Sequence, residues 1–232
     1  MMRRIVFLCS GGGGNLRFVV QALKRGVLGD ASVRGVLTDR ECLANRYARD
    51  HGIPTDVLDF SGDSQSPVIA ALDALAPDLV VTNVHKILSV SVVTAYRGRL
   101  VNLHYSLLPA YGGVIGARPV EMALADGAQF LGVTAHHVEV AVDAGRPIVQ
   151  AIMPTEPGDT AGELMDTVFR CGCLALLQAI ASVLRPANAT GGVRDIQVHG
   201  RDVRFNPLLS FGVSSFDEAF WRDLAAYPAA PI

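Results

Sequence analysis

The sequence lacks several features that would place it in a special class of protein. Its four cysteines include no C-x-x-C pair, so neither a disulfide framework nor a common zinc motif is indicated. It has no internal repeat and no low-complexity tract. No stretch approaches the roughly 18 uninterrupted apolar residues of a membrane helix. We therefore expect free thiols, no bound metal and no membrane contact.

An excess of charge of either sign is also missing. The formal net charge is −2 and 50% of the residues are hydrophobic, which describes an ordinary globular protein without a surface for polyanions. Nucleic acid is therefore not expected as a partner. The basic start at residues 1–4 and the apolar run 5–9 imitate a signal peptide, but glycines end the run too early. We expect a cytoplasmic protein.

Apolar runs and helical patterns alternate through the first hundred residues. Such an alternation predicts an α/β fold with a doubly wound, mostly parallel sheet. The expected strands are 4–9, 32–37, 55–58, 78–82 and 100–104, and the expected helices are 15–24, 41–50, 64–75 and 89–96.

The pattern changes after residue 125, where a helix over 119–125 ends. Two β-rich runs, 133–140 and 147–153, are separated by too few residues for a parallel crossover, so they should form an antiparallel extension at an edge of the sheet. A long amphipathic helix is expected over 160–184, capped by Asp159 or Thr160, and it should cover one face of the sheet.

The composition shifts again past Arg185, where proline and glycine become frequent. The runs 193–198 and 203–205 flank a turn and predict a β-hairpin. The last residues, with two prolines and several alanines, are expected to form a loosely held tail. We therefore expect a catalytic domain over residues 1–185 and a C-terminal hairpin and tail appendage over 186–232.

A glycine-rich turn joins the first predicted strand to the first predicted helix. Gly12, Gly13, Gly14 and Asn15 would let the backbone approach a ligand, and the helix N-terminus would offer N–H groups to a phosphate or carboxylate of the substrate. The spacing fits neither the dinucleotide fingerprint nor the P-loop, and a tight turn without a ligand is the structural alternative.

A second polar cluster ends the strand predicted over 100–104. Asn102 and His104 are two residues apart on this strand, so both side chains project from one face. In open α/β sheets ligands bind beyond the carboxyl ends of the strands, which makes this pair a candidate site. A buried, hydrogen-bonded pair with a structural role is the alternative.

The motifs around this pair resemble those of the folate-dependent formyltransferase family. Asn-x-His-x-Ser-Leu-Leu-Pro at 102–109 is followed, about forty residues later, by Asp-Ala-Gly-Arg-Pro at 143–147. The similarity runs over most of residues 3–185 and is greatest to the purine-pathway members, which formylate glycinamide ribonucleotide. The order and spacing of the motifs are specific, whereas each piece alone is weak.

The resemblance implies transfer of a formyl group from 10-formyltetrahydrofolate to a primary amine. It implies that Asn102 and His104 stabilise the oxyanion and that Asp143 orients His104 or passes a proton through water. Ser106 would join the glycine turn in binding the substrate. For Asp143, a turn aspartate in Asp-Ala-Gly is the structural alternative.

The resemblance also places the folate between two segments of the chain. His136 matches a family histidine near the active site, and backbone groups after it would hold the pterin. The residues expected to bind the folate are Lys86, Ile87, Leu88, Val93, Leu100, Val138, Glu139, Val140 and Ala141. For Leu88 and Val93, ordinary core packing is the alternative.

The match weakens at the segments that would border the acceptor. The loop 110–118 lacks the histidine of the purine enzymes, and residues 169–172 lack the glutamate that would grip the ribose hydroxyls. The acceptor could therefore be glycinamide ribonucleotide, an amino sugar or a natural-product amine. The small-molecule amine is the expected partner, bound by a monomer or a homodimer.

Two other activities remain as alternatives. A hydrolase of 10-formyltetrahydrofolate would use the same three residues with water as acceptor, although it usually carries an N-terminal regulatory domain that this sequence does not show. An NAD(P)-dependent oxidoreductase would use the glycine turn, with Asp39 reading a ribose hydroxyl, but the broken fingerprint disfavours it.

Overall fold

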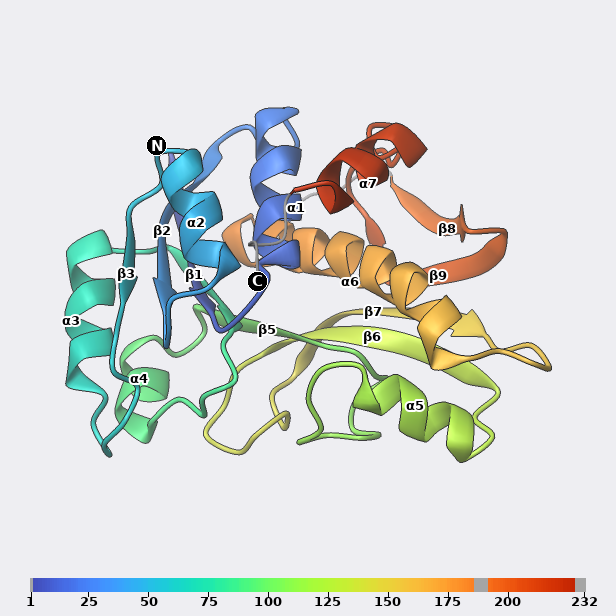
Figure 1. Cartoon of the computed structure of the whole chain (residues 1–232), viewed down its shortest axis with the longest axis horizontal. Helices are drawn as coiled ribbons and strands as arrows, with labels where there is room; N and C mark the ends of the chain where they lie inside the picture. Colours follow the sequence, from blue (N-terminus) through green and yellow to red (C-terminus); the bar gives the residue numbers. More distant parts are fainter. Residues whose placement is uncertain (1, 186–191, 228–232) are drawn as a thin grey trace. The chain divides into compact units, whose positions relative to one another are not determined.

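The computed structural model describes residues 2–185 and 192–227. The chain divides into two compact units, one made of Met1–Leu100 with Val213–Ile232 and the other of Val101–Gly212. Each unit contains helices packed on β-strands (Figure 1).

The first unit is built on four parallel strands in the order β3-β2-β1-β4. Its chain alternates strand and helix, as expected, because each parallel pair needs a crossover connection. The strands are β1 (Arg3–Cys9), β2 (Ala31–Thr38), β3 (Thr55–Val57) and β4 (Leu79–Asn83), and the helices are α1 (Gly14–Lys24), α2 (Leu43–Asp50), α3 (Ser66–Leu75), α4 (Val90–Ala95) and the C-terminal α7 (Glu218–Ala225).

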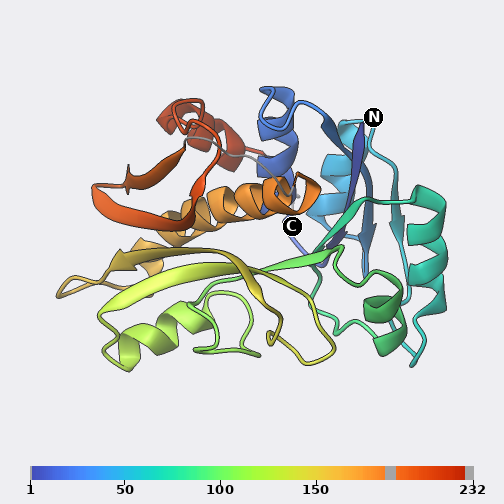
Figure 2. The same cartoon turned by 180° about the vertical axis from the view of Figure 1, so that it is seen from behind.

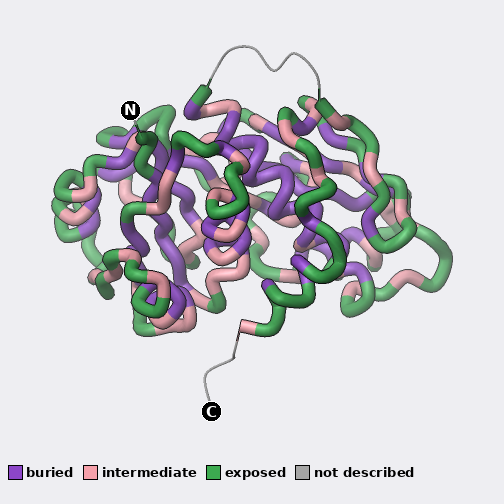
Figure 3. Tube along the Cα trace, turned by 90° about the horizontal axis from the view of Figure 1, so that it is seen from above, coloured by how far each residue is buried: buried purple, intermediate pink, exposed green. Residues whose placement is uncertain are grey.

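The core of the first unit lies around β1. Residues Ile5 to Leu8 are fully buried, since this strand pairs with β2 on one side and β4 on the other. Figure 3 colours the chain by burial and shows the buried segments surrounded by exposed loops. A strand covered in this way carries a continuous apolar run rather than an alternating one.

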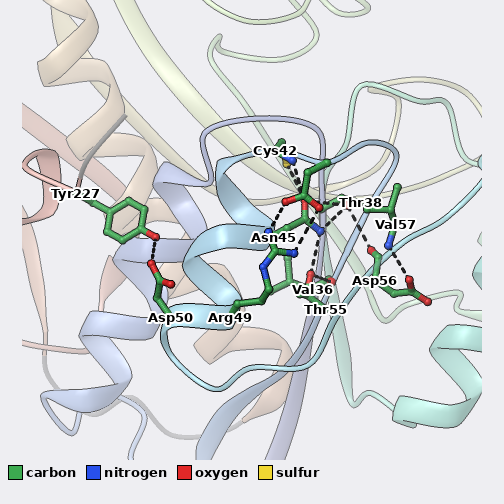
Figure 4. A network of polar contacts seen from close by, with 11 residues as sticks. Val36, Thr38, Cys42, Asn45, Arg49, Asp50, Thr55, Asp56, Val57 and Tyr227 are labelled. Atoms are coloured by element: carbon green, nitrogen blue, oxygen red, sulfur yellow. Dashed lines mark hydrogen bonds and ion pairs between the residues drawn. The ribbon is translucent and has the colours of Figure 1, made fainter. Parts of the chain in front are cut away.

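A buried amide ties α2 to two strands of the first unit (Figure 4). Asn45 is fully buried, and its Nδ2 donates to Thr38 Oγ1 at 2.8 Å and to Thr55 Oγ1 at 3.0 Å. Its Oδ1 accepts from the backbone N–H of Cys42 at 3.0 Å, which caps the start of α2. With these partners the amide is satisfied in the core, and the loop between β2 and α2 is fixed.

The helix α7 packs against α1 through aromatic side chains. The Trp221 ring stacks on Phe18 with centroids 5.3 Å apart, and Phe216 and Phe220 contact the same ring at 5.1 and 5.8 Å. Asp217 caps α7 by accepting from the Phe220 N–H at 2.8 Å. No helix was expected here from the sequence. The loosely held tail was expected for the last residues, and 228–232 lie outside the described residues, so that expectation stays a prediction.

The second unit is built on antiparallel strands in the order β5-β6-β7-β9-β8. The predicted hairpin is confirmed, and it continues the sheet by pairing β9 with β7. The strands are β5 (Leu100–His104), β6 (Phe130–His137), β7 (Pro147–Pro154), β8 (Val193–Val198) and β9 (Arg201–Leu209), and the helices are α5 (Arg118–Ala125) and α6 (Ala161–Leu184).

The helix α6 runs along β6 and β7 (Figure 2). Thr160 caps it, as one of the two expected residues. An 18-residue window of α6 has a mean hydropathy of 1.7, which by length and composition suffices for a membrane span. The expectation that no stretch approaches a membrane helix was therefore too strong. In the structure 83% of that window is buried, as in a core helix.

Most expected elements are confirmed within a few residues, and the α/β class with parallel and then antiparallel strands is confirmed. The strand β6 is the clearest shift, since it begins at Phe130 and ends at His137 rather than spanning 133–140. All four cysteines are free thiols. The expected domain boundary near residue 186 falls outside the described residues and stays a prediction.

Gly132 offers a test of packing between β6 and β7. A Cβ here would lie 2.2 Å from the Ala151 carbonyl oxygen and 2.5 Å from Leu107 Cδ2, so Gly132→Ala should lower the free energy of unfolding by about 1–3 kcal/mol. Urea titration measures this loss.

The matched control is Gly162→Ala in the first turn of α6, where the added methyl meets nothing within 4 Å. This change should raise stability by about 0.5–1 kcal/mol. Equal effects of the two substitutions would contradict the packing argument.

Candidate active site

His104 ends β5 in the second unit and is buried, with 6% of its surface exposed. Its strand pairs antiparallel with β6, which places His104 opposite Thr134 and Asn102 opposite His136. Asn102 is half-buried and lies two residues before His104, so the two side chains project from the same face of the strand, as predicted.

Hydrogen bonds on both ring nitrogens fix the orientation of His104. Nε2 lies 2.8 Å from the Val114 carbonyl oxygen and 3.3 Å from Asp143 Oδ2. Both neighbours are acceptors, so Nε2 carries a proton. Nδ1 lies 2.9 Å from Ser106 Oγ, which is also 2.5 Å from the Ala110 carbonyl oxygen, so the one hydroxyl proton is donated either to Nδ1 or to that carbonyl. The catalytic candidate therefore presents an N–H at Nε2.

The Asp143 carboxylate connects β5 to two loops of the second unit. Its Oδ2 accepts from the Gly113 N–H at 2.7 Å and lies beside His104 Nε2. Asp143 has a φ of 53°, in the left-handed region, so the turn around it is tightly constrained. The predicted convergence of Asp143 and His104 is confirmed by the distance of 3.3 Å between them.

Gly145 explains how the loop reaches this position. A Cβ at Gly145 would lie 1.6 Å from the His137 carbonyl oxygen, so only glycine allows the loop to lie this close to β6. The His137 N–H in turn donates to the Arg146 carbonyl at 3.0 Å. The backbone conformation of the Asp-Ala-Gly-Arg motif thus positions the Asp143 carboxylate beside His104.

A second buried histidine, His136, lies on the other side of Asp143. Its Nδ1 is 2.9 Å from the His137 carbonyl oxygen, so Nδ1 carries the proton in the neutral ring. Its Nε2 is 3.6 Å from Asp143 Oδ1 and has no hydrogen-bond partner within the described part of the chain. Burial lowers the pKa of His136, against the opposing influence of the His137 carbonyl and Asp143. The neutral ring is therefore favoured in the folded protein.

The turn after His104 is held by Thr134. The Thr134 hydroxyl donates to the Ser106 carbonyl at 2.8 Å and accepts from the Leu108 N–H at 3.1 Å. Gln150 on β7 donates to the same hydroxyl at 3.1 Å. These bonds are buried or partly buried, so the segment that carries Ser106 is a rigid support for the His104 ring.

The expected folate loop, residues Val138 to Ala141, follows β6 directly. Val138 is half-buried, Glu139 and Ala141 are exposed, and Val140 has 48% of its surface exposed. Exposed valines beside the polar cluster, here Val140 and Val142, provide apolar surface that a flat ring system could cover. The residues present therefore fit a pterin, and the binding role of this loop stays a prediction.

The remaining expected folate residues belong to the first unit. Lys86 and Ile87 are exposed, and Leu88 is half-buried. Val93 and Leu100 have only 1% and 0% of their surface exposed, which agrees with core packing. Their roles toward the folate stay predictions.

The glycine turn of the first unit is an open loop before α1. Gly12 is exposed, Gly13 and Gly14 are half-buried, and Asn15 is buried. Gly13 has a φ of 65° and caps α1 without a side-chain hydrogen bond. This geometry suits an anion at the helix N-terminus, and substrate binding here stays a prediction.

The Asp39 carboxylate is engaged by neighbouring residues of the first unit. Its side chain is 2% exposed and pairs with Arg40 at 2.7 Å. Although burial acts in the opposite direction, hydrogen bonds from Arg40 and Ser10 lower the pKa of Asp39. A carboxylate that is already paired is less available to bind ribose hydroxyls, which weighs against the alternative of a dinucleotide-dependent oxidoreductase.

Within residues 2–185 and 192–227, no group of three or more His, Cys, Asp or Glu side chains could hold a metal ion. Cys171 is buried in α6, and burial raises its pKa to about 12, so the thiol stays protonated at neutral pH. Catalysis without a metal stays a prediction. The polar cluster around Asp143 is the candidate active site.

Sequence reasoning missed two contributors to this cluster and expected a different role for a third. The Gly113 N–H and the Val114 carbonyl are backbone groups of an irregular loop, which carry no sequence signal. Ser106 was expected to bind substrate, but it is buried and contacts His104 Nδ1 and the Ala110 carbonyl, which supports a positioning role. Its substrate contact stays a prediction.

These motifs and this fold define a formyl-group transferase domain. The sequence profile described as formyl transferase matches residues 3–180. The chain therefore belongs to the formyl transferase family.

Two characterised relatives support this membership. The chain is 36% identical over 167 residues to phosphoribosylglycinamide formyltransferase of Escherichia coli (strain K12), covering 69% of this chain and 77% of that protein. It is 34% identical over 198 residues to the enzyme of the same name from Mycobacterium tuberculosis (strain ATCC 25618 / H37Rv), covering 82% and 86%.

A solved structure agrees. The phosphoribosylglycinamide formyltransferase from Bacillus halodurans superimposes with a TM-score of 0.73 at 27% identity, covering 81% of this chain and 98% of that one. The chain spans only 56% of the length of a chloroplastic relative from Vigna unguiculata, to which it is 34% identical.

The stability of the fold should decrease in acid because of two histidines, the buried His136 and the half-buried His137. Burial lowers the pKa of both His136 and His137, so the unfolded chain binds protons more tightly than the folded one below about pH 6.5. The free energy of unfolding should therefore fall as the pH drops from 7 through this range. His136→Gln should flatten the fall, as measured by urea titrations at several pH values.

The control is His85→Gln, which changes an exposed histidine of the first unit and should leave the pH dependence of the parent intact. An unchanged slope in His136→Gln would show that this ring does not titrate as described.

Proposed function

We propose that the protein transfers a formyl group from 10-formyltetrahydrofolate to a primary amine of a small molecule. The observation that carries the proposal is the distance of 3.3 Å between the side chains of His104 and Asp143. His104 lies on β5, which also bears Asn102, and Asp143 lies in the loop between β6 and β7. Carboxamide, imidazole and carboxylate are the groups that formyl transfer requires.

His104 supplies the donor for the developing oxyanion. Its Nε2–H now donates to the Val114 carbonyl oxygen at 2.8 Å, and that oxygen occupies the position that a substrate oxygen would take. When the amine nitrogen bonds to the formyl carbon, the formyl oxygen becomes negatively charged. The Nε2–H and the Asn102 carboxamide then stabilise it. Productive binding therefore requires residues 113–114 to withdraw from the His104 ring.

Asp143 orients His104 and transfers a proton from the attacking amine to the leaving folate nitrogen. The attacking amine must lose a proton while the leaving folate nitrogen gains one, and the bond from the formyl carbon to that nitrogen breaks. Asp143 accepts the first proton directly or through water and returns it to the leaving nitrogen. His136 Nε2 lies 3.6 Å from the other carboxylate oxygen, so the same Asp143 side chain adjoins both histidines.

Folate provides an activated one-carbon unit, and the chain provides the surface that holds it. The backbone of residues 138–143 is proposed to bind the pterin, because this loop leads into Asp143 and exposes Val140. Here the side chains can vary, since backbone groups make the polar contacts.

The acceptor is proposed to be an amine that need not carry a ribose. Glycinamide ribonucleotide is the first candidate, since the relatives are named for it. However, the helix α6 presents Arg170, Cys171 and Gly172 as buried residues near the expected position of a ribose-binding glutamate. A Cβ at Gly172 would lie 2.9 Å from the Tyr105 ring, so this part of α6 packs against β5. Amino sugars and natural-product amines therefore remain candidates.

Substitution of the three polar residues tests their roles. Asn102→Ala, His104→Ala and Asp143→Ala should each slow turnover at least about a hundredfold without unfolding the protein, because each removes a contact made to the transition state. Release of tetrahydrofolate is measured by absorbance, and circular dichroism checks the fold.

Gln129→Ala provides the control, since this residue of the second unit is exposed and its side chain donates to the nearby Gly127 carbonyl. It should retain the parental rate. Near-normal rates in all three catalytic variants would refute the assigned roles.

A panel of amines identifies the acceptor. Purified protein and 10-formyltetrahydrofolate are incubated with glycinamide ribonucleotide, amino sugars or other amines, and tetrahydrofolate is measured against formylated product. Transfer predicts equal amounts of the two with one acceptor class. Release at the same rate without any amine would instead show a hydrolase.

A further inference from the structure

A pocket with no part in the proposed reaction lies in the first unit, between α1, α2 and α7. Its volume is about 340 Å³, within the range of roughly 300–1,000 Å³ typical of small-molecule sites. Residues from all three helices and from the turn after α7 line it. They are Arg17, Gln21, Arg25, Tyr47, His51, Phe220, Asp223, Leu224, Ala226 and Tyr227.

Aromatic rings form much of the wall. Tyr47 is buried and stands edge-to-face with Tyr227, with ring centroids 5.1 Å apart. Tyr227 is held in place by its hydroxyl, which donates to Asp50 at 2.6 Å (Figure 4). The His51 ring stacks on Tyr47 with ring centroids 3.9 Å apart. These rings are fixed by their neighbours, so they offer a preformed surface for a flat ring.

Positive charge enters the same pocket from α1. The Arg17 guanidinium lies 5.5 Å from the Tyr227 ring and donates to the Leu224 carbonyl at 3.0 Å. The Arg25 guanidinium lies 4.5 Å from the Phe220 ring. Asp223 is the one carboxylate in the lining, so the two arginines leave an excess of positive charge.

Arg25 is the better anchor for an anion. In the described part of the chain its side chain donates only from Nη1, to Gln21 at 3.4 and 3.5 Å. Its Nε and Nη2 make no hydrogen bond there. These two groups form one edge of the guanidinium fork, which matches a carboxylate in two parallel hydrogen bonds.

From these contacts we propose that the pocket binds a small aromatic carboxylate. The carboxylate pairs with the Nε and Nη2 edge of Arg25, and the ring packs against Tyr47 and Tyr227. Charge and aromatic surface come from different helices, so affinity requires both parts of the ligand. None of the residues expected to act in catalysis, folate binding or substrate binding lines this pocket.

Trp221 provides a readout of binding. It is the one tryptophan of the chain, and its ring stands edge-to-face with the pocket residue Phe220 at 5.2 Å. Benzoate is the probe. Benzamide keeps the ring without the charge, cyclohexanecarboxylate keeps the charge without the aromatic ring, and acetate at matched ionic strength controls for salt.

Benzoate should change the tryptophan fluorescence saturably, whereas benzamide and cyclohexanecarboxylate should bind at least about tenfold more weakly. Arg25→Gln should weaken benzoate binding at least about tenfold, and Tyr227→Leu at least about fivefold. Arg34→Gln, an exposed arginine of β2, should leave the affinity unchanged.

Three results would each overturn the proposal. The first is the absence of a saturable response to benzoate up to about 20 mM. The second is equal binding of benzamide and benzoate. The third is an unchanged benzoate affinity in both Arg25→Gln and Tyr227→Leu when thermal melting shows these variants to be folded.

Discussion

The carboxylate of Asp143 is the interaction on which the candidate site depends. It accepts from the Gly113 N–H at 2.7 Å, lies 3.3 Å from His104 Nε2 and 3.6 Å from His136 Nε2. One side chain thereby joins β5, β6 and the loop after β5. Without a carboxylate at this position, the His104 ring would lose its charged partner and the loop would lose an anchor.

The support for this carboxylate is mostly backbone geometry. Gly145 allows the loop to lie against the His137 carbonyl, and the left-handed φ of 53° at Asp143 turns the side chain back toward β5. Thr134 and Gln150 then fix the segment that follows His104. Hydrogen bonds from several strands therefore fix Asp143 and the segment beside the His104 ring, whereas the loop at residues 113–114 has to move before an oxyanion can reach the Nε2–H.

Sequence patterns predicted the elements better than the contacts. Apolar runs located β1 and β4 because buried parallel strands carry continuous apolar residues. The strand β6 was placed three residues too late, because Val138 and Val140 continue the β-type composition after pairing with β5 has ended at His137. The helix α7 was missed, although Asp217 before Phe220, Trp221 and Leu224 is a readable cap and helical pattern. The motifs pointed to Asn102, His104 and Asp143, but no pattern could show that the Val114 carbonyl contacts His104 or that the Gly113 N–H contacts Asp143.

Cytoplasmic location, a monomer or homodimer, and the absence of nucleic-acid and membrane partners stay predictions.

The protonation of the His104 ring tests the central claim most directly. Nitrogen-15 NMR of the histidine rings at neutral pH, with His104 assigned by comparison with His104→Gln, identifies which nitrogens carry protons. The account predicts a proton on Nε2 of His104, donated to the acceptors that Val114 and Asp143 provide. A neutral His104 ring with its proton on Nδ1 and a bare Nε2 would contradict the proposed oxyanion donor.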